Sequence, residues 1–472
     1  MELTVRYVIP APAGDVASPA RMGDNIPMNL CWRSTMRDGL LSVLLCLSLA
    51  GTVQSETVAN TPLSLQNALD IALQQHPLLR IGQADIEAAQ QRVWQETAGY
   101  LPRGAYTYRF IREEIPVTTA VGGIEADNII RQRTTSQKFN FHSTNFGMSQ
   151  LLFDFGRTLH AIRSAVADVD ASRSDLETLK QTVIFNTKQA YYSLLSTQRL
   201  LKVAEETVRQ NTQLLEEAQA RLEVGLAPRF DVTQSQVQLS NAQLNLLIAK
   251  NNVALSHETL RTALGSPQPL IFSVEDTLDR RSFTFDAENI LTLAYASRSE
   301  LQSIQAQQRM TAERVAALQK QYLPSVSGNA QYNWTGREHP LQDGWQLGVT
   351  LTFPLFDDIR TIAQVGEVRA NLRRLKAQEE NLRLEITLEV RRSLLTLGQA
   401  EESIRVNAQT VLQAQENMEL AEGRYTTGVG NIIEVTDAQV SLTSARANKI
   451  QALYTFKTAL ADLERAVGKA LE

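Results

Sequence analysis

Hydrophobic residues recur at every seventh position along two long stretches of the chain that contain no proline. The first stretch lies between Asp154 and Pro228, and the second begins after Pro354. A small or medium-sized residue stands four positions before each of these apolar residues. A heptad sustained over this length predicts helices that pack along one another as in a coiled coil. The heptad residues of the two stretches are Leu194, Leu201, Val208, Leu215 and Leu222, and Leu397, Ile404, Val411, Met418 and Tyr425.

Each stretch predicts one very long helix that is followed, after a short turn, by a second helix. We expect the long helices at 154–223 and 357–427, and the helices that follow them at 231–264 and 431–467. At 1.5 Å per residue, the first long helix would measure roughly 105 Å. A shorter helix upstream is expected to begin at Pro77, because proline is favoured at a helix start. These lengths favour one long helix lying beside two short helices stacked end to end.

The segment before each long helix alternates between hydrophobic and polar residues, a period of two. Tyr106, Tyr108 and Phe110 alternate with polar residues, and the run from Trp345 to Phe353 alternates most regularly. We therefore expect two β-hairpins, at about 104–152 and 325–354, with strands of about ten residues. Strands of this length can cross an outer-membrane bilayer. A soluble hairpin that caps the coiled coil is the alternative interpretation of the same pattern.

The chain is one unit written twice. Leu152–Asp154 recurs as Leu355–Asp357, and Tyr100–Pro102 recurs as Tyr322–Pro324. Two copies of so large a unit indicate a duplication rather than a solenoid, whose repeats are shorter. We place the first repeat at 56–265, a linker at 266–285 in the equatorial region where the short helices meet, and the second repeat at 286–472.

Residues 1–55 are expected to be an upstream extension and a cleaved signal peptide. The apolar run Leu40–Ala50 follows basic residues and precedes small ones, as in a secretory signal. Its length is about half of the roughly twenty residues that a membrane helix needs, although a short N-terminal anchor is an alternative. Both cysteines, Cys31 and Cys46, lie in this segment. We therefore expect no disulfide and no cysteine-bound metal in the mature chain.

Composition excludes several classes of function. The chain has 46 basic and 51 acidic residues and a net charge of -5, so it has no basic excess with which to bind nucleic acid. Hydrophobic residues make up 43% of the chain, which is too few for a bundle of membrane helices. The five histidines form no pair at metal-binding spacing, and no phosphate-binding loop occurs. We expect no catalytic residues, no metal and no cofactor.

The number of strands bears on the oligomeric state. In a bilayer every backbone donor and acceptor must be paired, so a sheet with open edges is excluded. Four strands cannot close a barrel, because about eight is the minimum. Several copies must therefore contribute, and either two or three would give enough strands. The long helices would continue this ring as a hollow cylinder, which predicts a conduit for solutes.

Taken together, the signal segment, the duplication, Leu101-Pro102, Leu152–Asp154, Pro77 and the turn Val224–Leu226 resemble the TolC family of outer-membrane efflux and secretion channels. The resemblance covers residues 60–470. It implies a mixed α/β membrane protein of the bacterial outer membrane that extends into the periplasm. Its fold would be a homotrimeric twelve-stranded β-barrel, with four strands per chain, continued by a long α-helical barrel.

The same resemblance implies a function and partners. The chain would be the outer-membrane channel-tunnel of a tripartite efflux pump or of a type I secretion system. It would bind a periplasmic adaptor protein that bridges to an inner-membrane pump or to an ATP-binding cassette exporter. A periplasmic coiled-coil scaffold or adaptor is one alternative, and a passive solute porin is another.

The resemblance also implies two sets of site residues. The turns between antiparallel helices meet the adaptor in this family, although their glycines could simply end the helices in the left-handed conformation. The acids after the second turn match the periplasmic constriction, although they could simply stabilise a helix N-terminus. The family has an arginine latch where this chain has Gly430. The expected adaptor-contact residues are Arg221, Val224, Gly225, Leu226, Arg424, Gly428 and Val429, and the expected constriction residues are Glu434, Asp437, Asp231 and Tyr425.

A third set marks the junctions between strand and helix. Here we expect a structural role, with an aspartate at the helix start and apolar residues anchored at the membrane edge. The residues are Phe153, Asp154 and Arg157 in the first repeat, and Phe356, Asp357 and Arg360 in the second.

Overall fold

The computed structural model describes residues 63–121, 131–267, 274–276, 286–355 and 359–471. They belong to one compact unit that spans Asn60–Glu472. The expected signal segment, most of the linker between the repeats, and the junction residues Phe356 and Asp357 lie outside the described residues. No helix in the described ranges is long and apolar enough to cross a membrane.

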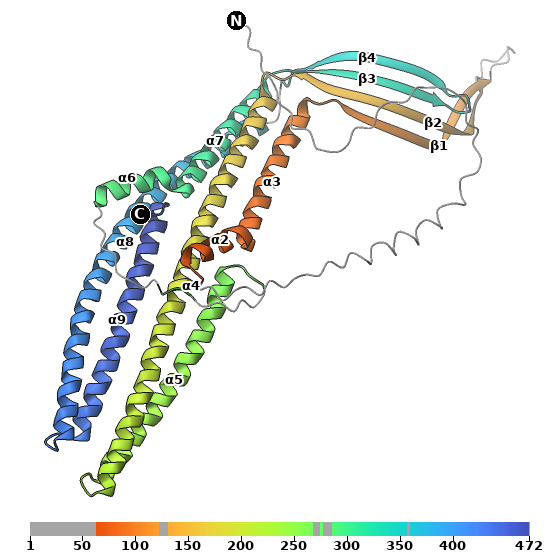
Figure 1. The fold of residues 1–472 in the computed structure, drawn as a ribbon. Helices are drawn as coiled ribbons and strands as arrows, with labels where there is room; N and C mark the ends of the chain where they lie inside the picture. Colours follow the sequence, from red (N-terminus) through yellow and green to blue (C-terminus); the bar gives the residue numbers. More distant parts are fainter. Residues whose placement is uncertain (1–62, 122–130, 268–273, 277–285, 356–358, 472) are drawn as a thin grey trace, which may run out of the picture. The chain divides into compact units, whose positions relative to one another are not determined.

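The two halves of the chain have the same order of elements (Figure 1). Each half has two short helices, a 3-10 turn, a β-hairpin, one helix of 67 residues and one final helix. The first half consists of α2 (Leu65–Gln75), α3 (Pro77–Thr97), η1 (Ala98–Tyr100), β1 (Arg103–Val121), β2 (Arg131–Phe153), α4 (Arg157–Glu223) and α5 (Arg229–Ala263). The second consists of α6 (Ala287–Ser297), α7 (Ser299–Gln319), η2 (Lys320–Tyr322), β3 (Ser325–Gly336), β4 (Gln342–Thr352), α8 (Arg360–Thr426) and α9 (Ile432–Val467).

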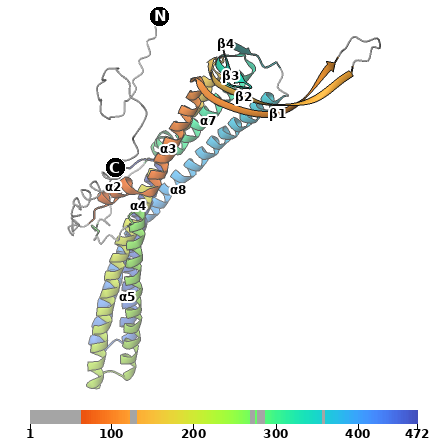
Figure 2. The ribbon, with the colours of Figure 1, turned by 90° about the vertical axis from the view of Figure 1, so that its right-hand side faces the viewer.

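The four strands form one antiparallel sheet in the order β1-β2-β3-β4. The expected length of about ten residues holds for β3 and β4, which have 12 and 11 residues. It is wrong for β1 and β2, which have 19 and 23 residues. The additional residues of the first repeat lengthen both strands, because β1 and β2 stay hydrogen-bonded to each other as far as Val121 and Arg131. Only the part of β2 from His142 onward pairs with β3, so the β1–β2 hairpin extends beyond the β3–β4 hairpin (Figures 1 and 2).

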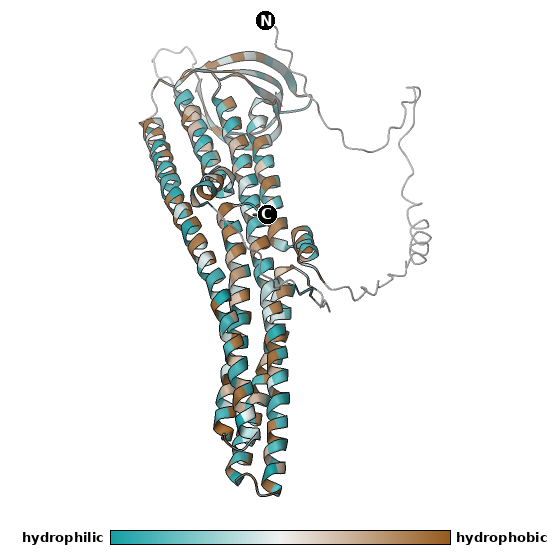
Figure 3. Ribbon diagram, turned by 60° about the vertical axis from the view of Figure 1, so that its left-hand side comes forward, coloured by the Kyte–Doolittle hydropathy of each residue, from teal (hydrophilic) through white to brown (hydrophobic). Residues whose placement is uncertain are grey.

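The helices continue the order of the strands. Near the sheet, α3 packs on α4, α4 on α7, and α7 on α8; farther along, α5 packs on α4, α4 on α9, and α9 on α8. The long helix α4 therefore lies beside α3 and α5, which follow one another end to end. The long helix α8 lies in the same way beside α7 and α9. In this layer α3 and α5 occupy one edge and α8 occupies the other. Figure 3 shows hydrophobic and hydrophilic residues mixed along the whole length of these helices.

Small and apolar side chains alternate in the seams between the helices. One core cluster buries Leu397, Ile404 and Phe456 together with Ala400 and Ala459. Alanine allows two backbones to approach closely, which suits a thin layer of helices better than a thick core. Heptad residues are buried in three core clusters of the described chain, Leu397 and Ile404 in this one, Leu194 in the second, and Met418 and Tyr425 in the third, although Leu222, near the end of α4, is exposed.

Each repeat closes where its final helix reaches the break between its two short helices. At the first break, Pro77 begins α3, and the Nδ1 atom of His76 accepts a hydrogen bond from the N–H of Leu78 (3.2 Å). Gly265, at φ +69°, lies against this break, and a Cβ atom added to it would be 2.8 Å from the Cα of His76. The contact requires glycine, both for its positive φ and for the close approach.

The second repeat closes in the same way. Gly468, at φ +79°, packs on Ser297 and Arg298 at the α6–α7 break. The buried Arg298 guanidinium donates to the Glu389 carboxylate (2.8 Å) and to the carbonyl of Ala466 (3.1 Å). The end of α9 is thereby joined to the start of α7.

Replacing Gly265 with alanine should destabilise the protein. The positive φ alone costs about 1–3 kcal/mol in a residue with a side chain, and the contact with His76 adds to this cost. The matched control is Gly398→Ala on an exposed turn of α8, where nothing lies within 4 Å of the added carbon. That change should stabilise the helix by up to about 1 kcal/mol. Thermal unfolding followed by circular dichroism measures both, and equal midpoints would show that the contact at Gly265 is not a constraint.

Candidate functional site: a two-faced sheet and two helical tips

The two faces of the sheet differ in polarity. Residues directly opposite one another on neighbouring strands share a face. One such row consists of Tyr106, Phe146, Tyr332 and Trp345, and the row next to it, on the opposite face, consists of Thr107, Asn145, Asn333 and Gly344. The aromatic face continues along β4 with exposed apolar side chains at Leu347, Val349 and Leu351. An apolar face backed by a polar face is the pattern of strands that separate lipid from water.

Within the described sheet, β1 and β4 each pair on one side only. Each strand is joined to one helix, and the helices lie in the same order as the strands. β1 follows α3, β2 leads into α4, β3 follows α7 and β4 leads into α8. The edge strands and the edge helices therefore lie on the same two sides of the molecule.

The edge helices α5 and α8 carry apolar side chains that are more than half exposed. Several large apolar side chains exposed along one helix mark a surface that can pack against another chain. Because the two edges differ in structure, one edge of a copy can meet the other edge of the next, as in a ring. The residues include Leu244, Leu247 and Leu255 on α5, and Leu384, Leu388 and Leu395 on α8.

The turn between α4 and α5 and the turn between α8 and α9 have the same construction. Gly225 and Gly428 both have φ +76°, and nothing would lie within 4 Å of a Cβ atom at either. The N–H of the residue after each glycine donates back to the helix, from Leu226 to the Arg221 carbonyl (2.8 Å) and from Val429 to the Arg424 carbonyl (3.0 Å). These are Schellman caps.

Both turns present apolar side chains to solvent. The exposed fractions are 69% for Val224, 76% for Leu226 and 71% for Val429. No residue in the described ranges covers these side chains, and the neighbouring glycines leave the backbone accessible. The two tips can therefore offer small apolar contacts to another protein.

Arg221 does not lie at the exposed tip but reaches across to the other hairpin. Its guanidinium donates to the carbonyls of Tyr425 (3.2 Å) and Thr426 (3.3 Å) and lies 4.7 Å from the centre of the Tyr425 ring. Glu217, one turn earlier on α4, accepts a further bond from it. Arg221 thus joins the two helical hairpins.

Tyr425 makes a second contact with the first hairpin. Its hydroxyl donates to the carboxylate of Asp231 (3.4 Å), and both side chains are buried. Burial raises the pKa of Asp231, and the hydrogen bond from Tyr425 opposes this shift. Burial and the Asp231 charge raise the pKa of Tyr425. A carboxylate is therefore held at the contact between the hairpins in surroundings that disfavour its charge.

The acids after the second turn have separate environments. Glu434 pairs with Arg424 (3.1 Å), and its N–H donates to the side chain of Asn431, which caps α9 (3.0 Å). Asp437 lies exposed one turn farther along. Gly430 has no room for a side chain, because an added Cβ atom would lie 2.9 Å from that of Arg424. Arg424, expected at the adaptor contact, is instead paired with Glu434 within its own hairpin.

The strand-to-helix junction depends on Asp154. Its buried carboxylate accepts bonds from the N–H groups of Gly156 (3.1 Å) and Thr158 (2.7 Å) and from the Thr158 hydroxyl (2.5 Å). Arg157 lies 3.9 Å from the same carboxylate, and the Phe153 ring packs 4.7 Å from Phe155. Asp154 therefore satisfies an N–H group in the first turn of α4, although Gly156 occupies the N-cap position itself. In the second repeat Arg360 is the first residue of α8.

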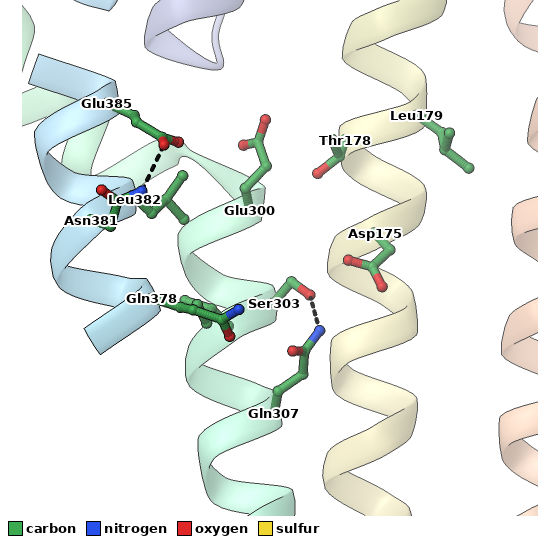
Figure 4. A pocket seen from close by; sticks show the side chains of 11 residues that line it. Asp175, Thr178, Leu179, Glu300, Ser303, Gln307, Gln378, Asn381, Leu382 and Glu385 are labelled. Atoms are coloured by element: carbon green, nitrogen blue, oxygen red, sulfur yellow. Dashed lines mark hydrogen bonds between the residues drawn. The ribbon is translucent and has the colours of Figure 1, made fainter. Parts of the chain in front are cut away.

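A crevice of about 560 Å³ lies between α4, α7 and α8 (Figure 4). Its polar side chains bind one another along their own helices, as Gln307 does with Ser303 and Asn381 with Glu385. Among the described residues no group of histidine, cysteine, aspartate and glutamate side chains could hold a metal ion.

The sequence matches the family described as outer membrane efflux protein over residues 68–266 and 290–469. It is similar to outer membrane protein TolC of Salmonella enteritidis, with 25% identity over 450 residues that cover 91% of this chain and 86% of that protein. It is also similar to the probable efflux pump outer membrane protein TtgC of Pseudomonas putida, with 22% identity and coverage of 86% and 83%. The fold is similar to that of the Campylobacter jejuni CmeC outer membrane channel, with a TM-score of 0.74, 18% identity and coverage of 86% of both chains.

The two matched segments correspond to the two halves of the chain, and together they span most of the described structure. The exposed apolar face of the sheet is what a protein of the outer membrane requires. This chain therefore belongs to the outer membrane efflux protein family and is an outer-membrane protein.

Proposed function

We propose that this protein is the homotrimeric channel-tunnel of a tripartite efflux pump, which gives solutes a passive exit from the periplasm. The observation that carries the proposal is the match between its two open sides. One side ends in β1, α3 and α5, and the other ends in β4 and α8. Joining the two sides of successive copies pairs the strand edges and covers the apolar stripes of the edge helices in a single arrangement.

The number of copies follows from the width of the passage. Two copies would give eight strands, and the interior of an eight-stranded barrel is filled by side chains. Three copies give twelve strands, which is the smallest ring of this chain that leaves room for water. The polar face, with Thr107, Asn145 and Asn333, would line that passage. A periplasmic scaffold, the alternative function, would have no use for a sheet with one exposed face that is mostly aromatic and apolar.

The helical layer would continue the passage below the sheet into the periplasm. Its tips are the farthest points from the sheet along α4, α5, α8 and α9, and their apolar side chains fit a periplasmic adaptor. Through that adaptor the channel would connect with an inner-membrane pump. Similarity to proteins named as efflux pump components favours a pump over a secretion system.

The contacts between the two hairpins would form the periplasmic gate. Arg221 and Asp231 of the first hairpin both bind Tyr425 of the second. Opening the lower end requires the hairpins to separate, which breaks these contacts. The Arg424–Glu434 pair lies within one hairpin and is exposed, so it would contribute little to closure. Asp437, repeated by threefold symmetry, would attract cations to the constriction.

Changing Leu226 to glutamate should abolish export and leave the trimer intact. Burial of one leucine against an adaptor contributes about 2 kcal/mol, so adaptor binding should weaken at least about thirty-fold. Leu226→Met, which keeps an apolar side chain, is the matched control. Export of a fluorescent dye and the amount of trimer are measured in the same cells. Normal export by the glutamate variant would show that Leu226 does not contact the adaptor.

Changing Tyr425 to phenylalanine should favour the open gate. The loss of one buried hydrogen bond costs about 1 kcal/mol, which shifts the opening equilibrium about fivefold. Tyr295→Phe is the control, because the Tyr295 hydroxyl also donates a hydrogen bond, to the Arg383 carbonyl (3.3 Å), but lies at the α6–α8 contact. Single-channel recording in planar bilayers should show more frequent opening for Tyr425→Phe alone. Equal behaviour of the two variants would show that Tyr425 does not hold the gate.

The gate should open more readily as pH rises from about 4. The pKa of Asp231 is raised in the closed state, so its protonated form stabilises closure in acid. This stabilisation is lost as pH rises through the raised pKa, because the buried carboxylate then becomes charged. Asp231→Asn keeps an acceptor for Tyr425 without the charge, and should stay closed and lose this pH dependence. An unchanged pH profile of opening in that variant would contradict the assignment.

A further inference from the structure

The part of the β1–β2 hairpin that extends beyond the β3–β4 hairpin has its polarity reversed. The change occurs at Phe110 and His142, which lie opposite one another where β3 ends its pairing at Gly336. Figure 2 shows this part of the hairpin running past the other two strands. From Ile111 to Val117 the ladder continues without a break, so each side chain keeps the face that the alternation gives it.

The face that is aromatic within the four-stranded sheet becomes charged in this extension. Beyond Phe110 it carries Arg112, Glu114 and Lys138. Glu114 pairs with Lys138 (3.4 Å) and also accepts a bond from the Ser136 hydroxyl. A charged face cannot remain in hydrocarbon, so the lipid boundary must lie near Phe110.

The opposite face changes in the other direction. Within the sheet it carries Thr107 and Arg109, and it is the face that would line the passage. Beyond the rim it becomes mostly apolar, with three polar residues: Glu113 opposite Phe139, Gln137 opposite Ile115 and Thr135 opposite Val117. Its described apolar residues are Ile111, Ile115, Val117, Phe139 and Phe141.

A contact with the second hairpin fixes the direction of this face. Arg337, directly after β3, places its guanidinium 4.1 Å from the centre of the Phe139 ring. Ile111 and Ile115 remain more than one-third exposed in the single chain. Apolar residues gathered on the water-facing side of a projecting hairpin mark a surface that another surface can cover.

We propose that the extended hairpins of the three copies lean together over the outer mouth and cover these apolar faces with one another, as a lid. The inference rests on the trimer of the proposed function. Twelve strands about 4.8 Å apart and tilted by about 40° give a ring of roughly 12 Å radius. The seven residues from Ile111 to Val117 span about 23 Å, so each hairpin can reach the axis. The passage would then be closed at both ends, by polar contacts at the periplasmic tips and by apolar contacts outside.

Cysteine cross-linking tests this arrangement, because the described residues contain no cysteine. Ile115→Cys places a thiol on the apolar face, and Pro116→Cys places one on the charged face one residue away. A short bismaleimide is added to intact cells that express the full chain. We expect covalent dimers of the chain from Ile115→Cys, and several-fold fewer from Pro116→Cys. Equal yields, or no dimers from Ile115→Cys, would overturn the lid.

A trimer assay on the same samples separates the two possible failures. Trimers on a mild-detergent gel without cross-linking at Ile115 would overturn the lid and leave the proposed channel standing. The absence of trimers would overturn both.

Conductance tests whether the lid closes the passage. In the Tyr425→Phe background, replacing Ile115 and Phe139 with serine should increase single-channel conductance, because the outer mouth then no longer limits the current. The matched control replaces Ser136 and Pro116 on the charged face with alanine. The same conductance in both would show that the hairpins do not obstruct the mouth.

Discussion

The need to pair every backbone group in a membrane determines how this molecule must assemble. The four strands leave β1 and β4 with unpaired edges, and a bilayer offers no water to satisfy them. Because the helices lie in the same order as the strands to which they are joined, pairing β1 with β4 of another copy also brings α3 and α5 against α8 of that copy. The exposed leucines of the edge helices, such as Leu247 and Leu395, are thereby covered by the interaction that completes the barrel.

Duplication explains how one chain makes both halves of a wall. Each repeat supplies a hairpin, a helix of 67 residues and shorter helices that fill its length. Gly265 and Gly468 close the two repeats by the same close approach to a helix break. The two repeats nevertheless differ in two places. The first hairpin became longer than the second, and the tyrosine at position 425 has no tyrosine counterpart at Leu222 in the first copy.

The periplasmic end combines firm and weak contacts. Schellman caps at Gly225 and Gly428 fix the shape of each tip, so the apolar side chains stay in place for a partner. The contact between the hairpins is less secure, because it holds the Asp231 carboxylate where burial disfavours its charge. In the proposed gate, rigid hairpins would separate at this contact. Arg221 takes part in the contact between the hairpins, whereas Val224, Leu226 and Val429 are exposed at the tips.

The sequence by itself determined the periodic elements, their order and their duplication. Heptads, strand alternation, Pro77 and the two turn glycines are local signals, because the side chains concerned act within a few residues of one another along the chain. The tertiary structure alone decided the length of β1 and β2, the contact of Arg221 with Tyr425 and the pairing of Arg424 with Glu434. These features depend on which segments lie side by side and on how closely they approach. No local period encodes that proximity. β1 and β2 pair residues that lie far apart along the chain, and Arg424 meets Glu434 across one turn. Arg221 reaches Tyr425 only when the two repeats pack together.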